Sequence, residues 1–244
     1  MENKAVTNPV VSSTAWPKVA DVDAFFASIT PQEIGRYKAY WATLAPEDYL
    51  ETFERWLFAF CSVHTTWSAN VRGFALIKPW FGWQQDTEEL KRRLTDSRMG
   101  LHINRTRFIA QFCDHYWKSP SKYYKQPAET WVACRDRLVK DILGLGIAKV
   151  SFALELIYPC NAQVVCLDTH MFQLYGLDQT KHARHYPALE RHWVGHCAHV
   201  DVPPAVARAI FWDRKQKKPD SRYWTHILER SPDQAPSTTT IITS

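Results

Sequence analysis

Glycine is scarce in this sequence, with 8 among 244 residues, or about 3% where ~7% is usual. So few glycines leave little room for the tight turns of an all-β fold. Long apolar runs are also missing, because none approaches the roughly 20 residues that span a bilayer. Residues 1–13 lack the charged-then-apolar layout of a secretion signal. We therefore expect a protein that neither crosses nor binds a membrane.

Core-forming residues are plentiful, at 45% hydrophobic with 11 Trp, 10 Tyr and 12 Phe. A chain of this length forms one substantial domain or two small ones. Cysteines without a secretion signal predict reduced thiols in a cytoplasm-like compartment. The six cysteines are Cys61, Cys113, Cys134, Cys160, Cys166 and Cys197.

Charge is distributed unevenly along the chain, whose formal net charge is +5. Residues 1–60 carry five Lys or Arg against eight Asp or Glu, whereas residues 91–125 carry nine Lys or Arg against two Asp. The basic stretch is interleaved with Tyr and Trp. Such a local excess suits a polyanion such as nucleic acid, although solvated helix faces carry similar charge.

The chain ends differ in composition from the middle. Residues 1–18 are polar and predict a flexible arm, and residues 231–244 are low in complexity and predict a disordered tail. Between them, residues 19–230 predict one catalytic domain, with a family-like core at 50–176 and added C-terminal helices at 186–230.

The pattern between the tails is helical almost throughout, which predicts an all-α fold. Thr30-Pro31-Gln32-Glu33 is a capping box with proline at the first helical position. From Tyr49 to Phe60 the apolar residues recur at helical spacing and predict a buried face. Further helices are expected near 68–78, 87–97, 104–118, 128–142, 147–158, 168–176, 186–199, 203–216 and 221–229. The short run 164–167 is strand-like.

Two glycines, Gly144 and Gly146, separate two helical patterns and predict a helix-turn-helix hairpin. Glycine exposes backbone N–H groups without side-chain obstruction, so the second helix can aim its N-terminus at an anion. Asp168 stands at the start of a later helix. There it is either an ordinary N-cap or, facing a DNA-bound hairpin, a catalytic carboxylate.

These features resemble the helix-hairpin-helix DNA glycosylase superfamily, the endonuclease III-like fold. Four segments follow the family's order along the chain. They are the string Cys61 to Trp67, the helix entry Met99 to Ile109 with Asn104 inside it, the hairpin Leu143-Gly144-Leu145-Gly146, and Asp168-Thr169-His170.

The resemblance implies a protein that grips double-stranded DNA and receives one extruded base in a cleft. Hairpin residues 143–149 (Leu143, Gly144, Leu145, Gly146, Ile147, Ala148 and Lys149) would contact phosphates, assisted by the basic stretch. No cofactor is implied, beyond a monovalent cation that such a hairpin could hold.

The chain departs from a base-excising enzyme of this family at several points. Bifunctional members carry a Schiff-base lysine two positions after the second hairpin glycine, where this chain has Ala148. Lys149 comes one residue later, and one helical step swings a side chain by about 100°. Lys149 is therefore either catalytic through a local bulge or a phosphate contact. His64 replaces a usual glutamine, and the four-cysteine iron–sulfur pattern is absent.

A closer resemblance covers the strings 58–67, 165–171 and 212–224. These are similar to the phage glutamyl/putrescinyl thymine pyrophosphorylases, also called amino acid:DNA transferases. That resemblance implies a phage protein acting in the cytoplasm of an infected bacterium. In it, an amine donor (an amino acid or polyamine) would displace pyrophosphate from the 5-methylene carbon of an activated 5-hydroxymethyluracil in DNA.

Asp168 is the expected base for the amine, and in a glycosylase it would stabilise the sugar cation or activate water. The catalytic set is completed by Lys149 and His64. Cationic donors for pyrophosphate are predicted among His64, Arg72, Lys149, Arg214, Lys215 and Arg222. Expected contacts to the base and its surroundings are Thr65, Trp67, Asn104, Cys166 and His170.

A histidine-rich helix carries a second constellation: His192, His196, Cys197 and His199. Two of these histidines lie at i and i+4, a spacing compatible with zinc. No Cys-x-x-Cys pair accompanies them, so we predict no metal site. A glycosylase and a non-catalytic DNA-binding module remain the alternatives to the transferase, and the sequence does not indicate an oligomeric state.

Overall fold

The computed structural model of the protein describes residues 16–217. Within that range the regular structure is entirely helical, as the sequence predicts, and no helix is long and apolar enough to cross a membrane. The α-helices are α1 Val19–Ser28, α2 Pro31–Ala42, α3 Tyr49–Cys61, α4 Trp67–Ile77, α5 Thr87–Asp96, α6 His102–Lys118, α7 Trp131–Asp141, α8 Ile147–Ile157, α9 Thr169–Leu174, α10 Gln179–His182, α11 Tyr186–His199 and α12 Pro204–Lys215. Short 3₁₀ helices span Trp80–Gly82, Pro120–Tyr123 and Ala183–His185.

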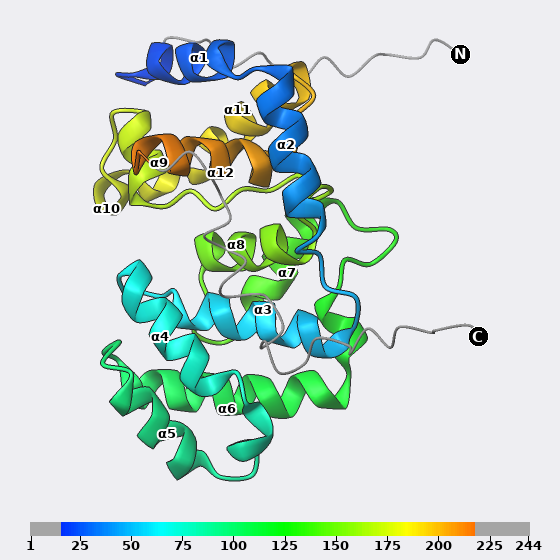
Figure 1. Ribbon diagram of the computed structural model, residues 1–244, viewed down its shortest axis with the longest axis vertical. Helices are drawn as coiled ribbons and strands as arrows, with labels where there is room; N and C mark the ends of the chain where they lie inside the picture. Colours follow the sequence, from blue (N-terminus) through cyan, green and yellow to red (C-terminus); the bar gives the residue numbers. More distant parts are fainter. Residues whose placement is uncertain (1–15, 218–244) are drawn as a thin grey trace, which may run out of the picture.

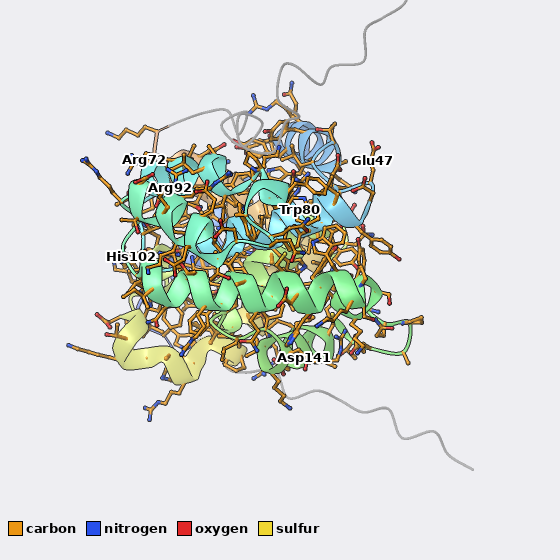
Figure 2. The ribbon with its side chains drawn as sticks, turned by 90° about the horizontal axis from the view of Figure 1, so that it is seen from below. Glu47, Arg72, Trp80, Arg92, His102 and Asp141 are labelled. Carbon is orange, nitrogen blue, oxygen red and sulfur yellow. The ribbon has the colours of Figure 1, made fainter. Side chains whose placement is uncertain are left out.

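The helices gather in two groups (Figure 1). Helices α3 to α8 form the lower group, with α6 and α5 at its end. The upper group combines α1 and α2 from the beginning of the chain with α9 to α12 from its later part; α2 packs on α12, and α1 contacts α9. Seen from below, α6 runs across the lower group, with Arg72 and Arg92 on the side of α4 and α5 (Figure 2).

Helix boundaries agree closely with the local signals in the sequence. Thr30 accepts a hydrogen bond from the backbone N–H of Glu33, as the capping box predicts, and α2 begins at Pro31. Asp48, Thr66, Asp86 and Thr130 cap α3, α4, α5 and α7 in the same way. The short helices α1 and α10 carry no such periodic signal and were not predicted. The predicted helix at 221–229 and the tail at 231–244 lie outside the described residues.

Aromatic side chains dominate the core around α3. Phe53 contacts Phe112, Tyr116 and Trp117 of α6 and Trp80 of the first 3₁₀ helix, with ring centroids 5.1–5.8 Å apart. The predicted single buried face of α3 is too narrow, because residues 52, 53 and 55–61 are all buried. Helix α3 therefore lies inside the molecule between α4, α6 and α8.

Trp16 belongs to the packed structure, although the sequence analysis assigned it to the arm. Its side chain is buried, and its ring meets those of Tyr175 and His192 edge-on at centroid separations of 5.3 and 5.2 Å. Next to it, the backbone N–H of Lys18 donates to the carbonyl of Tyr175. Residues 16–18 therefore fasten the start of α1 against α9 and α11.

The strand-like run 164–167 is extended but has no partner strand among the described residues. Side chains satisfy its buried main chain instead. The N–H groups of Val165, Cys166 and Leu167 donate to Glu190, Glu155 and the Tyr186 hydroxyl respectively, and that hydroxyl donates to the carbonyl of Val165. Side chains of α8 and α11 thus hold the run in place, and Asp168 follows it directly.

Each of these two carboxylates is buried beside an arginine. Arg208 of α12 makes a bidentate contact with Glu155, and Arg135 of α7 donates to both oxygens of Glu190 at 2.7 Å. Burial raises the pKa of each carboxyl, and the neighbouring guanidinium opposes that shift. Removing one partner would strand the other charge in the core.

We expect Arg135→Ala to lower the free energy of unfolding by about 3–5 kcal/mol, because Glu190 would stay buried without its partner. Urea denaturation measures the change. Arg92→Ala is the control, since Arg92 pairs with Glu89 and Asp96 on the surface and its loss should not be measurable. Equal denaturation midpoints for the two variants would contradict the assignment.

Candidate active site

A cavity of about 560 Å³ lies where the two helix groups meet. Most of its lining comes from the loop between α3 and α4, the start of α4, the turn into α8, the start of α9, and α12. Most of the predicted site residues are on this lining. They are His64, Thr65, Trp67, Gly144, Gly146, Ile147, Ala148, Lys149, Cys166, Asp168 and His170.

Asp168 acts as a helix cap and also faces the cavity, so the two interpretations of this residue are compatible. One carboxylate oxygen, Oδ1, accepts hydrogen bonds from the N–H groups of His170 and Met171 at 2.9 and 3.1 Å. The other, Oδ2, accepts from the indole N–H of Trp212 at 3.0 Å. About a quarter of the side chain is exposed, which leaves it accessible to a ligand.

Two residues of α12, Arg208 and Trp212, hold this carboxylate and were not among the predicted site residues. A nitrogen of Arg208 lies 3.9 Å from Oδ2 of Asp168, while the same guanidinium binds Glu155. Trp212 lay within a string used for the family resemblance, but nothing in the sequence linked it to Asp168. Because Arg208 and Trp212 are four residues apart, both lie on one face of α12.

The two hairpin glycines have different physical requirements. Gly144 has a φ of +91°, and a Cβ atom there would lie 2.3 Å from the ring of Phe108 on α6. Gly146 caps α8 with an ordinary φ of −85°, and a Cβ there would meet no atom within 4 Å. Gly144 is thus required by the fold, whereas Gly146 leaves open space beside the N-terminus of α8.

The two hairpin leucines do not line the cavity. Leu145 is buried in the core, and Leu143 is half exposed on the outside of the turn. Leu143 therefore stays available as a surface contact of the hairpin, whereas Leu145 anchors the turn.

Lys149 lies in the first turn of α8 and lines the cavity together with Ala148. Its ammonium group is 5.7 Å from the ring centroid of Phe152, and its charge partly opposes the rise that burial causes in the pKa of Cys166. The one-residue offset from the family's lysine therefore does not remove this amine from the cavity, and no bulge interrupts α8.

The loop between α3 and α4 brings His64 and Thr65 to the cavity, and Trp67 at the start of α4 lines it beside them. His64 is exposed and adopts a left-handed backbone with a φ of 44°, which is uncommon for a residue with a side chain. The ring of Trp67 packs edge-on against Phe58 of α3. The imidazole of His64 is therefore exposed at the rim of the cavity, next to a tryptophan that is packed against α3.

Cys166 and His170 differ in their reactivity. Burial raises the pKa of the Cys166 thiol to about 12, so it stays protonated at neutral pH and is a poor nucleophile. His170 stands edge-on to Trp212, and its Nδ1 is buried without a hydrogen-bond partner within residues 16–217. His170 and Cys166 thus both line the cavity, but neither is an activated nucleophile.

Several predicted residues lie elsewhere. Arg72 donates to the carbonyl of Ser97, and Asn104 is exposed on α6; neither lines the cavity. Arg214 binds Glu33 and Ser28, and Lys215 lies beside Phe211, in a separate depression next to α1. Arg72, Arg214 and Lys215, predicted as donors to a leaving pyrophosphate, therefore lie away from the cavity, and so does Asn104, predicted as a contact to the base. Arg222 lies outside the described residues.

The basic stretch 91–125 is only partly available to a polyanion. Arg105 is buried and donates to the carbonyls of Phe60 and Val63, and Arg93 binds Glu89. Arg107 is exposed and lies over the ring of Phe108, at 4.8 Å from its centroid. Since Phe108 packs on Gly144, Arg107 lies near the hairpin.

Comparison with solved structures identifies the fold. The *Methanocaldococcus jannaschii* 8-oxoguanine glycosylase/lyase, crystallised with a 15mer DNA containing 8-oxoguanine, matches with a TM-score of 0.64 and 18% identity over 83% of this chain and 98% of that one. The 8-oxoguanine DNA glycosylase of *Thermotoga maritima* matches with a TM-score of 0.62 and 15% identity, covering 83% and 97%. No protein-family profile and no curated protein sequence matches the chain. The fold is thus that of helix-hairpin-helix DNA glycosylases.

We expect Gly144→Ala to destabilise the protein by at least about 2 kcal/mol, because alanine disfavours positive φ and its methyl group would displace Phe108. A fall in Tm of about 4–8 °C would report this loss. Gly146→Ala is the matched variant and should unfold within about 0.5 kcal/mol of the wild type. A Gly144→Ala protein that melts like Gly146→Ala would refute the steric account.

Proposed function

We propose that the chain is an enzyme that acts on double-stranded DNA and excises a modified base, as a DNA glycosylase. The observation that carries the proposal is that the hairpin, Lys149 and Asp168 line one cavity. The fold of the 8-oxoguanine DNA glycosylases supports it. The cavity is of the size that small-ligand pockets have in proteins, so a flipped base can enter it.

Binding would begin at the hairpin. In the first turn of α8 the N–H groups of Lys149 and Val150 donate to the carbonyl of Gly146, which leaves those of Ile147 and Ala148 to donate to a phosphate placed at the helix N-terminus. Gly146 has no side chain to keep that phosphate away, and Arg107 adds positive charge nearby. A strand held there would present the neighbouring nucleotide to the cavity, with the edge of His64 at the rim.

Excision breaks the bond between C1′ of the sugar and the base. The bonding electrons leave with the base, and positive charge develops on the sugar. Asp168 lies on the cavity wall with Oδ2 toward Trp212, so its carboxylate would stabilise that charge and accept a proton from the attacking nucleophile. The nucleophile is either water, which leaves an abasic site, or the amine of Lys149, which forms a covalent Schiff base.

A second candidate is the transfer of an amine to an activated 5-hydroxymethyluracil, with loss of pyrophosphate. Ala148 at the position of the family's Schiff-base lysine favours it. Of the five predicted pyrophosphate donors within residues 16–217, only His64 and Lys149 line the cavity, with Arg208 as an unpredicted third. Because Arg208 is already bound to Glu155, this donor set is weaker than the sequence suggested.

Product analysis separates the candidates. The full chain is incubated with duplexes that carry 8-oxoguanine, other damaged bases, or the activated hydroxymethyluracil together with amines. The DNA is then digested to nucleosides, and their masses are measured. We expect abasic sites. Adducts of the amine would overturn excision in favour of transfer, and unchanged nucleosides with tight DNA binding would leave a binding module.

Asp168→Asn should lower turnover by about 10³-fold while sparing DNA affinity, because the amide keeps the shape but neither accepts the proton nor carries charge.

Borohydride trapping tests the role of Lys149. If its amine is the nucleophile, wild-type protein becomes covalently bound to the substrate DNA on reduction, and Lys149→Ala does not. Lys140→Ala is the control, because Lys140 is exposed on α7 and outside the cavity lining. Base release without any trapped adduct would instead assign the attack to water.

A further inference from the structure

A second chemically distinct cluster lies away from the cavity, between α1 and α11. His192 and His196 sit one turn apart on α11, and Asp23 comes from α1. One ligand atom from each of the three lies within 4.8 Å of the others. None of the three lines the candidate active site.

We propose that Asp23, His192 and His196 form a zinc site that fastens α1 to α11. Two imidazoles and one carboxylate are a donor set that zinc accepts. Zn–N and Zn–O bonds of about 2.0–2.2 Å at tetrahedral angles place ligand atoms about 3.4 Å apart. Oδ1 of Asp23 already lies 3.1 Å from Nε2 of His196, so these two helices need little movement to bind the ion.

The surroundings of His192 support a ligand role. Its Nδ1 lies 3.1 Å from the hydroxyl of Tyr175, and that hydroxyl donates to the carbonyl of Leu189. In the tautomer of His192 that carries its proton on Nδ1, the hydroxyl oxygen accepts from Nδ1–H, and Nε2 is the nitrogen for the metal. Metal-binding histidines commonly have their other nitrogen held in this way, because it fixes the tautomer and the ring orientation.

Packing also fixes His196 and the approach of α1. The imidazole of His196 stacks on Phe26 of α1 with a centroid separation of 4.9 Å, and Trp16 meets the ring of His192 edge-on. Half of the Asp23 side chain and about a quarter of that of His196 are exposed. Water can therefore complete the coordination sphere from the open side. Cys197 and His199, predicted as neighbours of this pair, are not part of the cluster.

Zinc titration of the untagged, chelator-stripped full chain tests the proposal. We expect one Zn²⁺ per chain, no competition by Mg²⁺, and a rise in Tm of about 5–10 °C when free zinc exceeds the Kd by about 100-fold. Asp23→Asn and His196→Gln should each weaken zinc binding more than about 10-fold. His199→Gln, an exposed histidine on the same helix, should bind zinc like the wild type.

His196→Gln can weaken zinc binding simply by disturbing packing. Asp23→Asn does not share this problem, because half of the Asp23 side chain is exposed. Without zinc, this variant should melt like the stripped wild type. Equal zinc affinity in Asp23→Asn and the wild type would overturn the site. A wild-type chain that takes up no zinc at ~100 μM would overturn it as well.

Discussion

The candidate site depends on a single extended run, residues 164–167, whose buried backbone pairs with side chains instead of another strand. Unpaired buried amides are costly, so the run is stable only while Glu155, Glu190 and Tyr186 stay in place. The two carboxylates in turn need Arg208 and Arg135. Four helices therefore converge to define where Asp168 begins α9.

The same network connects the two ends of the described chain with the cavity. Arg208 bridges the carboxylate that holds the extended run and the one proposed for chemistry, and Trp212 touches the latter. Both stand on α12, which packs on α2. The helices outside the family-like core are thus part of the cavity wall and of its support.

The sequence predicts most of the helices because their signals are local: caps, a proline at the first position, and apolar residues at helical spacing. It also predicts the hairpin turn and the helix start at Asp168, because both are marked by local residues and by their order along the chain. It does not predict which cations face the cavity. Successive residues on a helix turn by about 100°, so Arg214 is directed away from the face that carries Arg208 and Trp212. Which face meets the cavity depends on packing with α2 and α8. Trp16 and Asp23 illustrate the same limit, since their partners are more than 150 residues away.

The residue type at position 144 depends on the side chain of Phe108, which packs against it. The aromatic ring occupies the space in which any side chain at position 144 would begin. These positions are 36 residues apart, yet each restricts what the other can become during evolution. Replacing Gly144 by a residue with a side chain requires a smaller side chain at position 108, and that change removes the aromatic ring that Arg107 lies over. Drift at the hairpin is therefore constrained by the α6 ring that faces it, in addition to the positive φ of Gly144.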